Sequence, residues 1–488
     1  MIEYNTNIKI KNGAKMRVKF ITLGCKTNQY ETNAMEEKFA QSGYEIVDKN
    51  EISDILVINT CSVTNIAERK SRQMLRKAKE QNTKAITVAC GCYAQVAKED
   101  IEKMPEVDVI IGINEKINIV EIVEEYIKNK TAKNKVEEIS DVMHQSEFEE
   151  FGTTTYKDQN RAVIKIQDGC DRFCTYCIIP YARGKVRSRK PENILKEIKE
   201  IAQKGIKEVV ITGIHIASYG KDFIEEDVLK YRKEYNYSEK YEKFNPTKDL
   251  SSGGFRLIEL LEQINKIDEI ERIRIGSLEP ILITKEFVSR LSKINKICNH
   301  FHLSLQSGCN ETLKRMNRRY TVEEFENSVK MLRNAYKNVS LTTDIIVGFP
   351  GESEEEFIET YNFLKKIKFY KMHIFKYSPK KGTKAEQMQN QISGQIKEKR
   401  SRILIELSNT NEREYNNSYI GKEFEVLFEE REGSFIKGHT TNYVMVKVQT
   451  KEELENQIRK VEITKTEKLD VIGILKDRKD NYAKNKIK

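Results

Sequence analysis

The chain has 488 residues and a net charge of +10, from 85 lysines and arginines against 75 aspartates and glutamates. At about 150 residues per domain, this length predicts roughly three domains. The moderate basic surplus allows a polyanionic partner but excludes a histone-like charge density. Because the sequence shows no signal peptide and no apolar run of bilayer-spanning length, we expect a cytoplasmic protein without membrane contact.

Residues 16–130 are predicted to form a parallel α/β domain. Helix-like stretches separate three strand-like runs, which cover 17–23, 55–60 and 84–89. A cysteine follows each run: Cys25, Cys61, and then Cys90 or Cys92. Parallel strands end at one edge of their sheet, so three of these thiols should meet there and form a metal site. The alternative is three ordinary buried cysteines.

The next segments indicate two further modules. Residues 131–160 are polar and lack periodicity, which is typical of a linker. Between residues 161 and 415, six strand-like runs alternate with helix-like stretches and predict a closed or partial (β/α) barrel. Residues 221–254 interrupt it, either as a surface excursion or as a helical flap. Residues 416–480 alternate as a small β-barrel of about five strands.

The chain has nine cysteines, an odd number grouped in short motifs, which favours metal binding or catalysis over disulfide bonds. Cys170, Cys174 and Cys177 form a C-x3-C-x2-C motif directly after the first barrel strand, so they should lie at the catalytic end of the barrel. A structural zinc site closes with four ligands, and no second cysteine pair lies nearby. An iron-sulfur cluster held by only three thiolates keeps one iron open for another ligand.

This motif at the mouth of a (β/α) barrel resembles the radical S-adenosylmethionine (SAM) superfamily. Further segments, including "TLGCKTNQYETNAM", "GCYAQ", "HLSLQSGCNETLKRMNRRYT" and "TDIIVGFPGES", are similar in order to those of the methylthiotransferases along most of the chain. Within that family, "NQYETNAM" and "CSVTNIAERKSRQ" most resemble the branch that modifies N6-threonylcarbamoyladenosine in tRNA.

The resemblance implies two [4Fe-4S] clusters and S-adenosylmethionine as cofactors. One cluster would be held by Cys170, Cys174 and Cys177, which act in catalysis, and the auxiliary cluster by Cys25, Cys61 and Cys92. Cys92 is preferred over Cys90 because it is the cysteine of "GCYAQ". A methylthio group would be added to carbon 2 of the adenine by a radical route that consumes two molecules of S-adenosylmethionine.

The resemblance also implies tRNA as a partner, bound in part by a C-terminal TRAM domain, and an electron donor such as flavodoxin or ferredoxin; it does not identify the sulfur donor. Sister branches act on isopentenyladenosine in tRNA or on an aspartate of a ribosomal protein, and both stay open as alternatives. A noncatalytic iron-sulfur protein that binds RNA is the alternative of another class. Related chains begin near Met16, so residues 1–15 are interpreted as a disordered extension.

Polar residues at or just after the barrel strands are candidates for contacts with the cofactor. These candidates are Tyr176, Gly213, Ser277, Glu279, Ser304, Gln306 and Asp344. Helix caps and turns, or a packing role for the tyrosine, would explain them equally well. Candidates for RNA contacts are Arg183, Lys185, Arg187 and Arg189 after the cysteine loop, and Lys437, His439 and Tyr443 in the C-terminal domain. A solvated basic face is the alternative. Neither His215 nor His302 is assigned a role.

Overall fold

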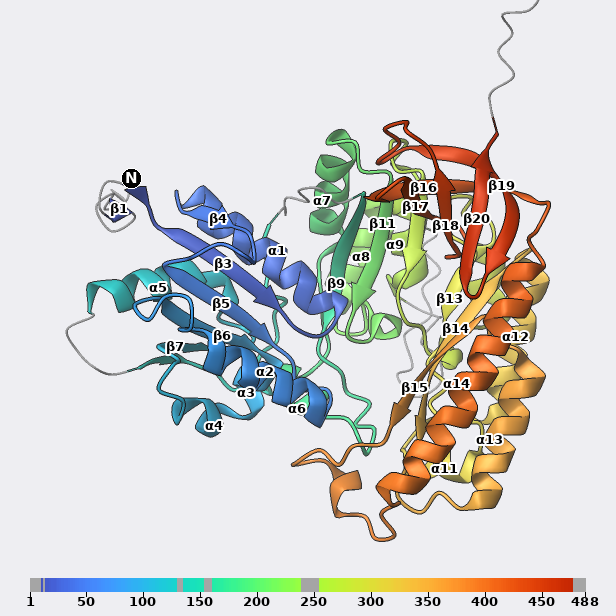
Figure 1. Cartoon of the computed structure of the whole chain (residues 1–488), viewed down its shortest axis with the longest axis horizontal. Coiled ribbons are helices and arrows are strands. Elements are labelled where there is room, and N and C mark those ends of the chain that lie inside the picture. The colour runs from blue at the N-terminus through green and yellow to red at the C-terminus, as the bar shows by residue number, and fades with distance from the viewer. Residues whose placement is uncertain (1–9, 12–13, 130–134, 153–159, 238–253, 477–488) are drawn as a thin grey trace, which may run out of the picture.

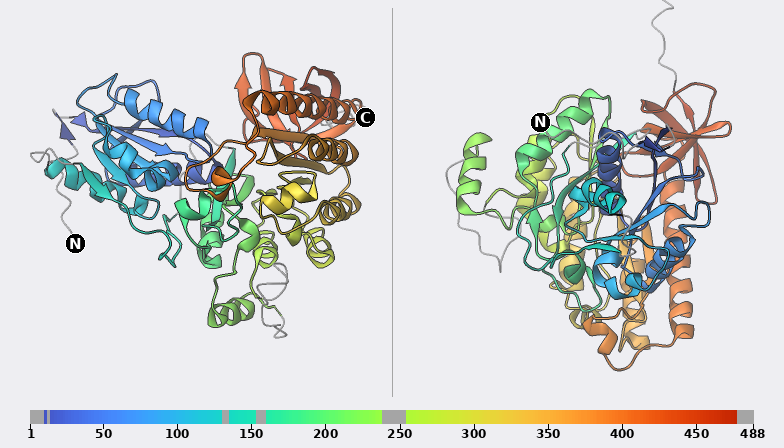
Figure 2. Two further views of the ribbon diagram at one scale, coloured as in Figure 1. Left: turned by 90° about the horizontal axis from the view of Figure 1, so that it is seen from below. Right: turned by 90° about the vertical axis from the view of Figure 1, so that its left-hand side faces the viewer.

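The structure is a computed structural model that describes residues 10–11, 14–129, 135–152, 160–237 and 254–476. An N-terminal α/β domain, a half-barrel of strands backed by helices, and a small closed β-barrel follow one another along the chain (Figure 1). Figure 2 shows in its left view that the N-terminal domain and the β-barrel lie on different sides of the half-barrel. The predicted fold class is confirmed. None of the described helices is long and apolar enough to cross a membrane.

The N-terminal domain is a parallel six-stranded sheet with the order β4-β3-β5-β6-β7-β8. Its strands are β4 (Glu45–Val47), β3 (Arg17–Thr22), β5 (Ile55–Thr60), β6 (Ile86–Gly91), β7 (Val109–Ile111) and β8 (Val136–Glu138). One apolar cluster joins the sheet to α1 (Lys26–Gln41) and α5 (Ile119–Lys128). A second cluster, on the other face, involves α2 (Asn65–Lys77) and α4 (Lys98–Glu102).

Two expectations for the flanking segments change. Strand β8 lies inside the predicted linker and pairs in parallel with β7, so the sheet extends beyond residue 130. The polar sequence hid it because an edge strand buries few side chains. Of residues 1–15, the described parts form β1 (Ile10–Lys11) and β2 (Ala14–Lys15), which pair in antiparallel. The rest of the predicted disorder lies outside the described residues.

The half-barrel contains all six predicted strands in two sheets. The first has the order β10-β9-β11-β12, and the second the order β13-β14-β15. Isolated bridges such as Leu278–Leu303 connect β12 to β13. The strands are β9 (Arg161–Asp168), β10 (Arg187–Ser188), β11 (Glu208–Gly213), β12 (Arg272–Ile275), β13 (His300–His302), β14 (Ser340–Val347) and β15 (Lys371–Lys376).

Alternating residues of these strands face the outer helices or the inside of the half-barrel. Ala162, Ile164 and Ile166 of β9 join the main core, which packs against α7 (Pro191–Gln203). Fully burying an aliphatic side chain such as Ile198 of α7 contributes about 1.5–3 kcal/mol. The other outer helices are α9 (Leu257–Ile264), α10 (Lys285–Leu291), α11 (Asn310–Arg315), α12 (Val322–Ala335) and α13 (Glu354–Ile367).

The inner face of the half-barrel is polar where a packed barrel would be apolar. Its side chains alternate with those of the core and include arginines, histidines and two carboxylates, namely Arg161, Lys165, Gln167, Glu208, Arg272, Arg274, His300, His302, Thr342, Asp344 and His373. Helix α1 of the N-terminal domain contacts β9 and β11, and thus lies beside this face. The half-barrel is therefore built to receive polar groups rather than to be filled by its own side chains.

The insertion at residues 221–254 begins with α8 (Glu225–Glu234), whose Val228 and Tyr231 are buried. The choice between excursion and flap concerns mainly residues 238–253, which lie outside the described residues. After α14 (Gly394–Asn417), a closed barrel has the order β16-β17-β18-β20-β19. Its strands are β16 (Glu423–Glu432), β17 (Phe435–Thr440), β18 (Met445–Gln449), β19 (Ile458–Glu467) and β20 (Asp470–Leu475).

Candidate functional site

The cysteine loop of the half-barrel begins at Gly169, where any side chain would collide with the neighbouring backbone. Gly169 has a φ of +71°, and a Cβ there would lie 1.7 Å from the carbonyl oxygen of Lys185. The next residue, Cys170, donates its N–H to the carbonyl of Gly184 over 3.0 Å, and Cys177 donates to that of Cys174 over 2.9 Å. These bonds position the thiols at the carboxyl end of β9.

Arg318 is the cation beside these thiols, and the sequence analysis missed it. Its Nη1 donates to the sulfur of Cys174 over 3.3 Å, and its Nη2 lies 3.1 Å from Glu279. Burial raises the pKa values of Cys170 and Cys177 to about 12, so both thiols hold their protons at neutral pH until a metal displaces them. Arg318 thus supplies positive charge where thiolates would form.

Glu279 is the centre of a buried ion cluster rather than a free carboxylate. Its oxygens lie 2.7 Å from Arg172, 3.0 Å from His215 and 3.1 Å from Arg318. Burial alone would raise the pKa of Glu279, but His215, Arg318 and Arg172 together hold it well below its usual range. Glu279 therefore stays charged and holds the cysteine loop against the end of β12, and His215 takes part in this role.

The other predicted cofactor contacts lie around the same rim, with one exception. Gly213 closes on Gln167 at a bulge between β11 and β9, Ser277 is exposed after β12, and Ser304 accepts a hydrogen bond from Arg318 through its backbone carbonyl. Gln306 has a φ of +72° and bridges to β14. Strand β14 continues past Asp344 to Val347, so the predicted place of Asp344 at a strand end is wrong. Tyr176 packs edge-on against Phe349.

The N-terminal thiols meet where three strand ends converge. Cys25 caps α1, Cys61 follows β5, and Cys92 begins α3 (Cys92–Val96). Gly24 has a φ of +107°, and a Cβ there would lie 2.9 Å from the sulfur of Cys61, so the glycine allows the two loops to approach. Burial, with smaller contributions from the neighbouring Cys92 and Cys25, raises the pKa of Cys61 to about 11. The three thiols therefore lie close enough to act on one another electrostatically at the same edge of the sheet.

Cys90 and Cys92 lie in different surroundings. The Cys90 side chain is fully buried in the apolar cluster of α1 and α5, with its sulfur 3.7 Å from the carbonyl of Ile58. Cys92 faces the half-barrel, where Arg183 Nε donates to its sulfur over 3.3 Å. Cys92 also interacts electrostatically with Cys61 and with Cys177 of the other thiol set. This placement supports Cys92 as the third N-terminal thiol.

Arg183 is buried between the N-terminal domain and the half-barrel and forms ion pairs with both. Its predicted contact with RNA phosphate is therefore wrong. Arg183 ends α6 (Ile179–Arg183), is fully buried, and its Nη1 lies 2.7 Å from Glu31 of α1 and 3.0 Å from Asp168 of β9. Lys116 and Lys165 also pair with Glu31. Burial would raise the pKa of Glu31, but Arg183 and the two lysines hold it well below its usual range.

Arg187 and Arg189 are buried too, which corrects their predicted contacts with RNA. Arg187 donates to the carbonyl of Arg183 over 2.8 Å, and Arg189 pairs with Glu150 and Glu197. Each is 1% exposed. In sequence these arginines are indistinguishable from a basic surface, because the carboxylates that neutralise them come from distant segments.

Glu149, in the predicted linker, gives the interface a testable dependence on pH. Its Oε1 accepts the N–H of Ile117 over 2.7 Å, and burial raises its pKa to about 7. The folded state thus binds the proton more tightly than the unfolded state, and stability falls as pH rises from about 4.5 to above 7. A shift of this size corresponds to at most about 3 kcal/mol.

Glu149→Gln should therefore raise the melting temperature at pH 8 more than at pH 5.5, because glutamine keeps the acceptor and removes the buried charge. Thermal unfolding at both values measures this difference. Glu147→Gln, two residues away and exposed, is the control. Equal shifts at the two pH values would contradict the assignment.

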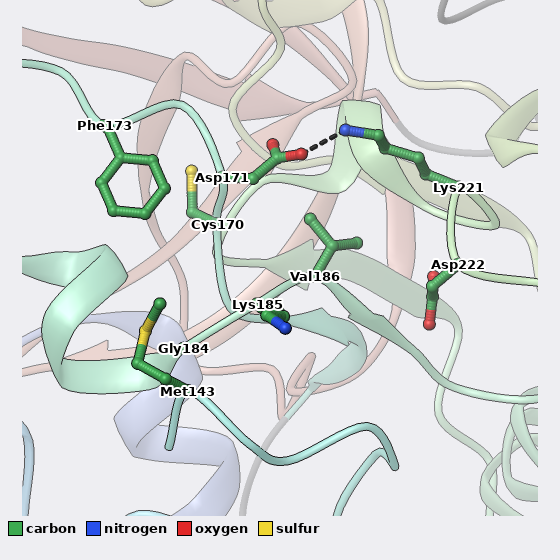
Figure 3. A pocket seen from close by; sticks show the side chains of 9 residues that line it. All are labelled: Met143, Cys170, Asp171, Phe173, Gly184, Lys185, Val186, Lys221 and Asp222. Carbon is green, nitrogen blue, oxygen red and sulfur yellow. Dashed lines mark hydrogen bonds and ion pairs between the residues drawn. The ribbon is translucent and has the colours of Figure 1, made fainter. Parts of the chain in front are cut away.

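A pocket of about 340 Å³ opens beside Cys170 (Figure 3). Figure 3 shows Asp171 and Lys221 paired above it, with Lys185 and Asp222 below. Lys185 was predicted to contact RNA, and of the four basic residues after the cysteine loop it is the one that lines this pocket. The pocket opens onto the cysteine loop at Cys170, and the linker residue Met143 forms part of its lining.

Two of the three predicted RNA contacts in the β-barrel lie in the interface with the half-barrel. His439 is 8% exposed and lies 2.7 Å from Glu429. The ring of Tyr443 is stacked between His439 and His300, with centroids 4.6 and 4.7 Å away. The prediction for His439 is therefore wrong, because its side chain is buried in domain packing, whereas Tyr443 is half-buried and its RNA contact stays a prediction. Lys437 remains on the barrel surface, paired with Glu430 over 3.1 Å.

A group of metal-ligating side chains lies on the inner face of the half-barrel. The donor atoms of His302, Asp344 and His373 are within 4.8 Å of one another, and His302 Nε2 lies 3.2 Å from Asp344. His302 Nδ1 also contacts the hydroxyl of Thr342 over 3.0 Å. The group has the ligand types for a divalent cation, but both ring nitrogens of His302 are already engaged, by Asp344 and by Thr342.

Comparison with known proteins places these sites in a family. Residues 164–364 match the model of the radical SAM superfamily, and residues 17–112 match that of the uncharacterized protein family UPF0004. Threonylcarbamoyladenosine tRNA methylthiotransferase MtaB of Bacillus subtilis is 38% identical over 454 residues, which are 92% of this chain and 94% of that protein. The chain belongs to the radical SAM methylthiotransferases.

Other relatives of this methylthiotransferase carry two different names. MtaB of Aquifex aeolicus is 40% identical and covers 91% of this chain and 99% of its own length. The tRNA-2-methylthio-N(6)-dimethylallyladenosine synthase of Protochlamydia amoebophila is 33% identical and covers 91% and 92%. Among solved structures, the radical S-adenosylmethionine methyltransferase TsrM of Kitasatospora setae aligns with a TM-score of 0.49 at 12% identity, over 74% of this chain and 73% of that chain.

The thiol sets fit the cofactors of the family, which are [4Fe-4S] clusters and S-adenosylmethionine. Each set offers three sulfurs and an arginine N–H at 3.3 Å from one of them, Arg318 at Cys174 and Arg183 at Cys92. A cluster held by three thiolates is anionic and keeps one open iron, so a buried cation beside each set matches its charge.

Proposed function

We propose that this methylthiotransferase adds a methylthio group to carbon 2 of N6-threonylcarbamoyladenosine in tRNA, next to the anticodon. The observation that carries the proposal is the approach of two groups of three thiols from different domains, since α3 contacts α6 and Cys92 acts electrostatically on Cys177. Sulfur insertion at an unactivated C–H needs a radical source and a sulfur donor side by side. The near full-length similarity to MtaB supports the choice of substrate. In this proposal Cys170, Cys174 and Cys177 hold one cluster, and Cys25, Cys61 and Cys92 hold the other.

When bound, the clusters supply the electron that cleaves S-adenosylmethionine and the place where sulfur is held for transfer. The chain supplies position and charge. Arg318 and Arg183 donate hydrogen bonds to one sulfur of each set, which stabilises the thiolate form. Glu279, held by Arg172, Arg318 and His215, fixes the cysteine loop, and Gly169 lets that loop turn directly after β9.

The exposed side chains around the rim, such as Ser277, remain proposed contacts for S-adenosylmethionine. Lys437 remains a proposed contact for RNA, and a flavodoxin or ferredoxin the proposed electron donor. A cytoplasmic location would follow from the tRNA substrate. The relatives named for dimethylallyladenosine keep that nucleoside as the second candidate substrate.

Mass spectrometry of nucleosides tests the proposal most directly. tRNA is compared from a strain that lacks this protein and from the same strain carrying either wild type or Cys170→Ala. We expect the methylthio form of threonylcarbamoyladenosine to be absent from the deletion strain and from Cys170→Ala, and to return with wild type. If that nucleoside is unaffected while the methylthio form of dimethylallyladenosine disappears, the reaction holds and the substrate is wrong. If neither changes, the tRNA assignment fails.

A further inference from the structure

Three modules meet at the inner floor of the half-barrel, around Tyr443. This tyrosine has a φ of +66° and reaches from the β-barrel between two histidine rings. The Arg274 guanidinium lies 4.7 Å from its ring centroid and that of Arg161 lies 5.7 Å away. The same floor faces α1 of the N-terminal domain, which contacts β9 and β11. Residues far apart in sequence therefore share one polar surface.

Each arginine of this floor lies within ion-pair distance of a carboxylate. Arg274 Nε donates to Glu208 over 2.7 Å, and Arg161 lies 2.9 Å from Glu429. Glu208 also has Arg272 at 4.0 Å. The three arginines therefore outnumber the two carboxylates before any further charge is added.

Lys26 brings an additional cation to this surface. It is the first residue of α1, directly after Cys25, and its side chain is exposed. Within the described residues its ammonium has no hydrogen bond and no ion pair. Its helix contacts β9 and β11, and the groups that act on its ammonium electrostatically are Tyr443, Arg161, Arg274 and Glu208, so it lies at the edge of the floor. An exposed cation at the edge of this polar floor is placed to meet an anion that enters there.

The two kinds of relative differ in the chemistry of the base that they name. Threonylcarbamoyladenosine carries a carboxylate and a hydroxyl on its N6 substituent, whereas the dimethylallyl group is a hydrocarbon. A surface with surplus positive charge favours the first and offers a hydrocarbon no compensation for displaced water. Next to this floor, His373 on the same inner face offers a hydrogen bond for a hydroxyl.

We propose that Lys26 binds the carboxylate of the substrate's N6 substituent and thereby selects threonylcarbamoyladenosine over bases with an apolar substituent. This inference rests on the proposed function. It assigns a specificity role to the residue that adjoins a candidate cluster ligand, so that the same turn of chain would hold both the cluster and the substituent of the base. The carboxylate of S-adenosylmethionine and a phosphate of RNA are the other anions of similar chemistry.

Binding of three anticodon stem-loop RNAs separates these sources. The RNAs carry threonylcarbamoyladenosine, dimethylallyladenosine or plain adenosine at the same position, and their affinities are measured without S-adenosylmethionine. We expect Lys26→Gln to weaken binding of the first RNA about tenfold to a hundredfold, as for a lost charged hydrogen bond, and to leave the others unchanged. Lys26→Arg should restore most of the affinity. Lys38→Gln, on the same helix, is the matched control.

Iron content and visible absorption are compared for all variants, and binding is repeated on cluster-free protein, because Lys26 adjoins Cys25. Equal weakening of all three RNAs would assign Lys26 to a phosphate and overturn the inference. A loss confined to cleavage of S-adenosylmethionine without RNA would assign it to the cofactor and also overturn it. If wild type itself neither prefers nor modifies the threonylcarbamoyl RNA, the proposed function fails, which is distinguishable from the failure of Lys26 alone.

Discussion

Arg183→Met should lower both the stability of the protein and its iron content. The side chain is fully buried, and its loss leaves Glu31 and Asp168 with fewer cations and Cys92 without its hydrogen-bond donor. Breaking a buried ion pair from one side costs about 3–5 kcal/mol. We expect iron to fall from about eight to about four per chain, because the N-terminal cluster loses the cation beside its third ligand.

Arg189→Met is the matched control for this experiment. Arg189 is equally buried and pairs with Glu150 and Glu197, but it does not contact a cysteine sulfur. The control should lose stability in urea or thermal unfolding while keeping its iron. Arg183→Lys should lose less stability and less iron than Arg183→Met, because lysine keeps the positive charge. It should still fall below wild type, because lysine lacks the guanidinium that donates to several acceptors at once. If both methionine variants lose iron to the same extent, the effect is one of folding and not of the bond to Cys92.

The arginine cluster also shows which parts of the molecule were predictable. Strands β9, β11 and β14 follow from apolar periodicity, because local sequence decides which residues face a core. The pairing of Arg183 with Glu31 joins residues 152 positions apart, and nothing local distinguishes an arginine that meets phosphate from one that meets a buried carboxylate. Only the packing of α1 against β9 supplies that information.

The thiol sites were more predictable than the polar residues around them. Each of Cys25, Cys61 and Cys92 follows a strand of a parallel sheet, and topology alone brings such positions together. By contrast, Tyr443 and His439 looked like surface residues of a small barrel, and their burial depends on how that barrel docks on β12 and β13. In the structure Tyr443 has a positive φ, which turns its ring toward the half-barrel. The sequence "TTNYV" does not reveal this backbone conformation.

Cys92→Ala and Cys90→Ala should differ sharply, although the two residues are separated by one position. Cys92 lies at the start of α3 beside Arg183, and Cys90 is enclosed in the core between β6 and α1. Removing Cys92 should lower iron to about four per chain and abolish the methylthio product, while cleavage of S-adenosylmethionine at the other thiol set continues. Removing Cys90 should cost about 1 kcal/mol of stability and leave iron unchanged.

Cys170→Ala completes the comparison, because it should abolish cleavage of S-adenosylmethionine and also leave about four irons per chain. Iron and sulfide analysis, 5'-deoxyadenosine release and the modified nucleoside are measured on the same preparations. Iron loss in Cys90→Ala with iron retained in Cys92→Ala would reverse the ligand assignment. Loss of cofactor cleavage in Cys92→Ala would contradict the expected independence of the two sites. It would show that the proximity of Cys92 to Cys177 couples them.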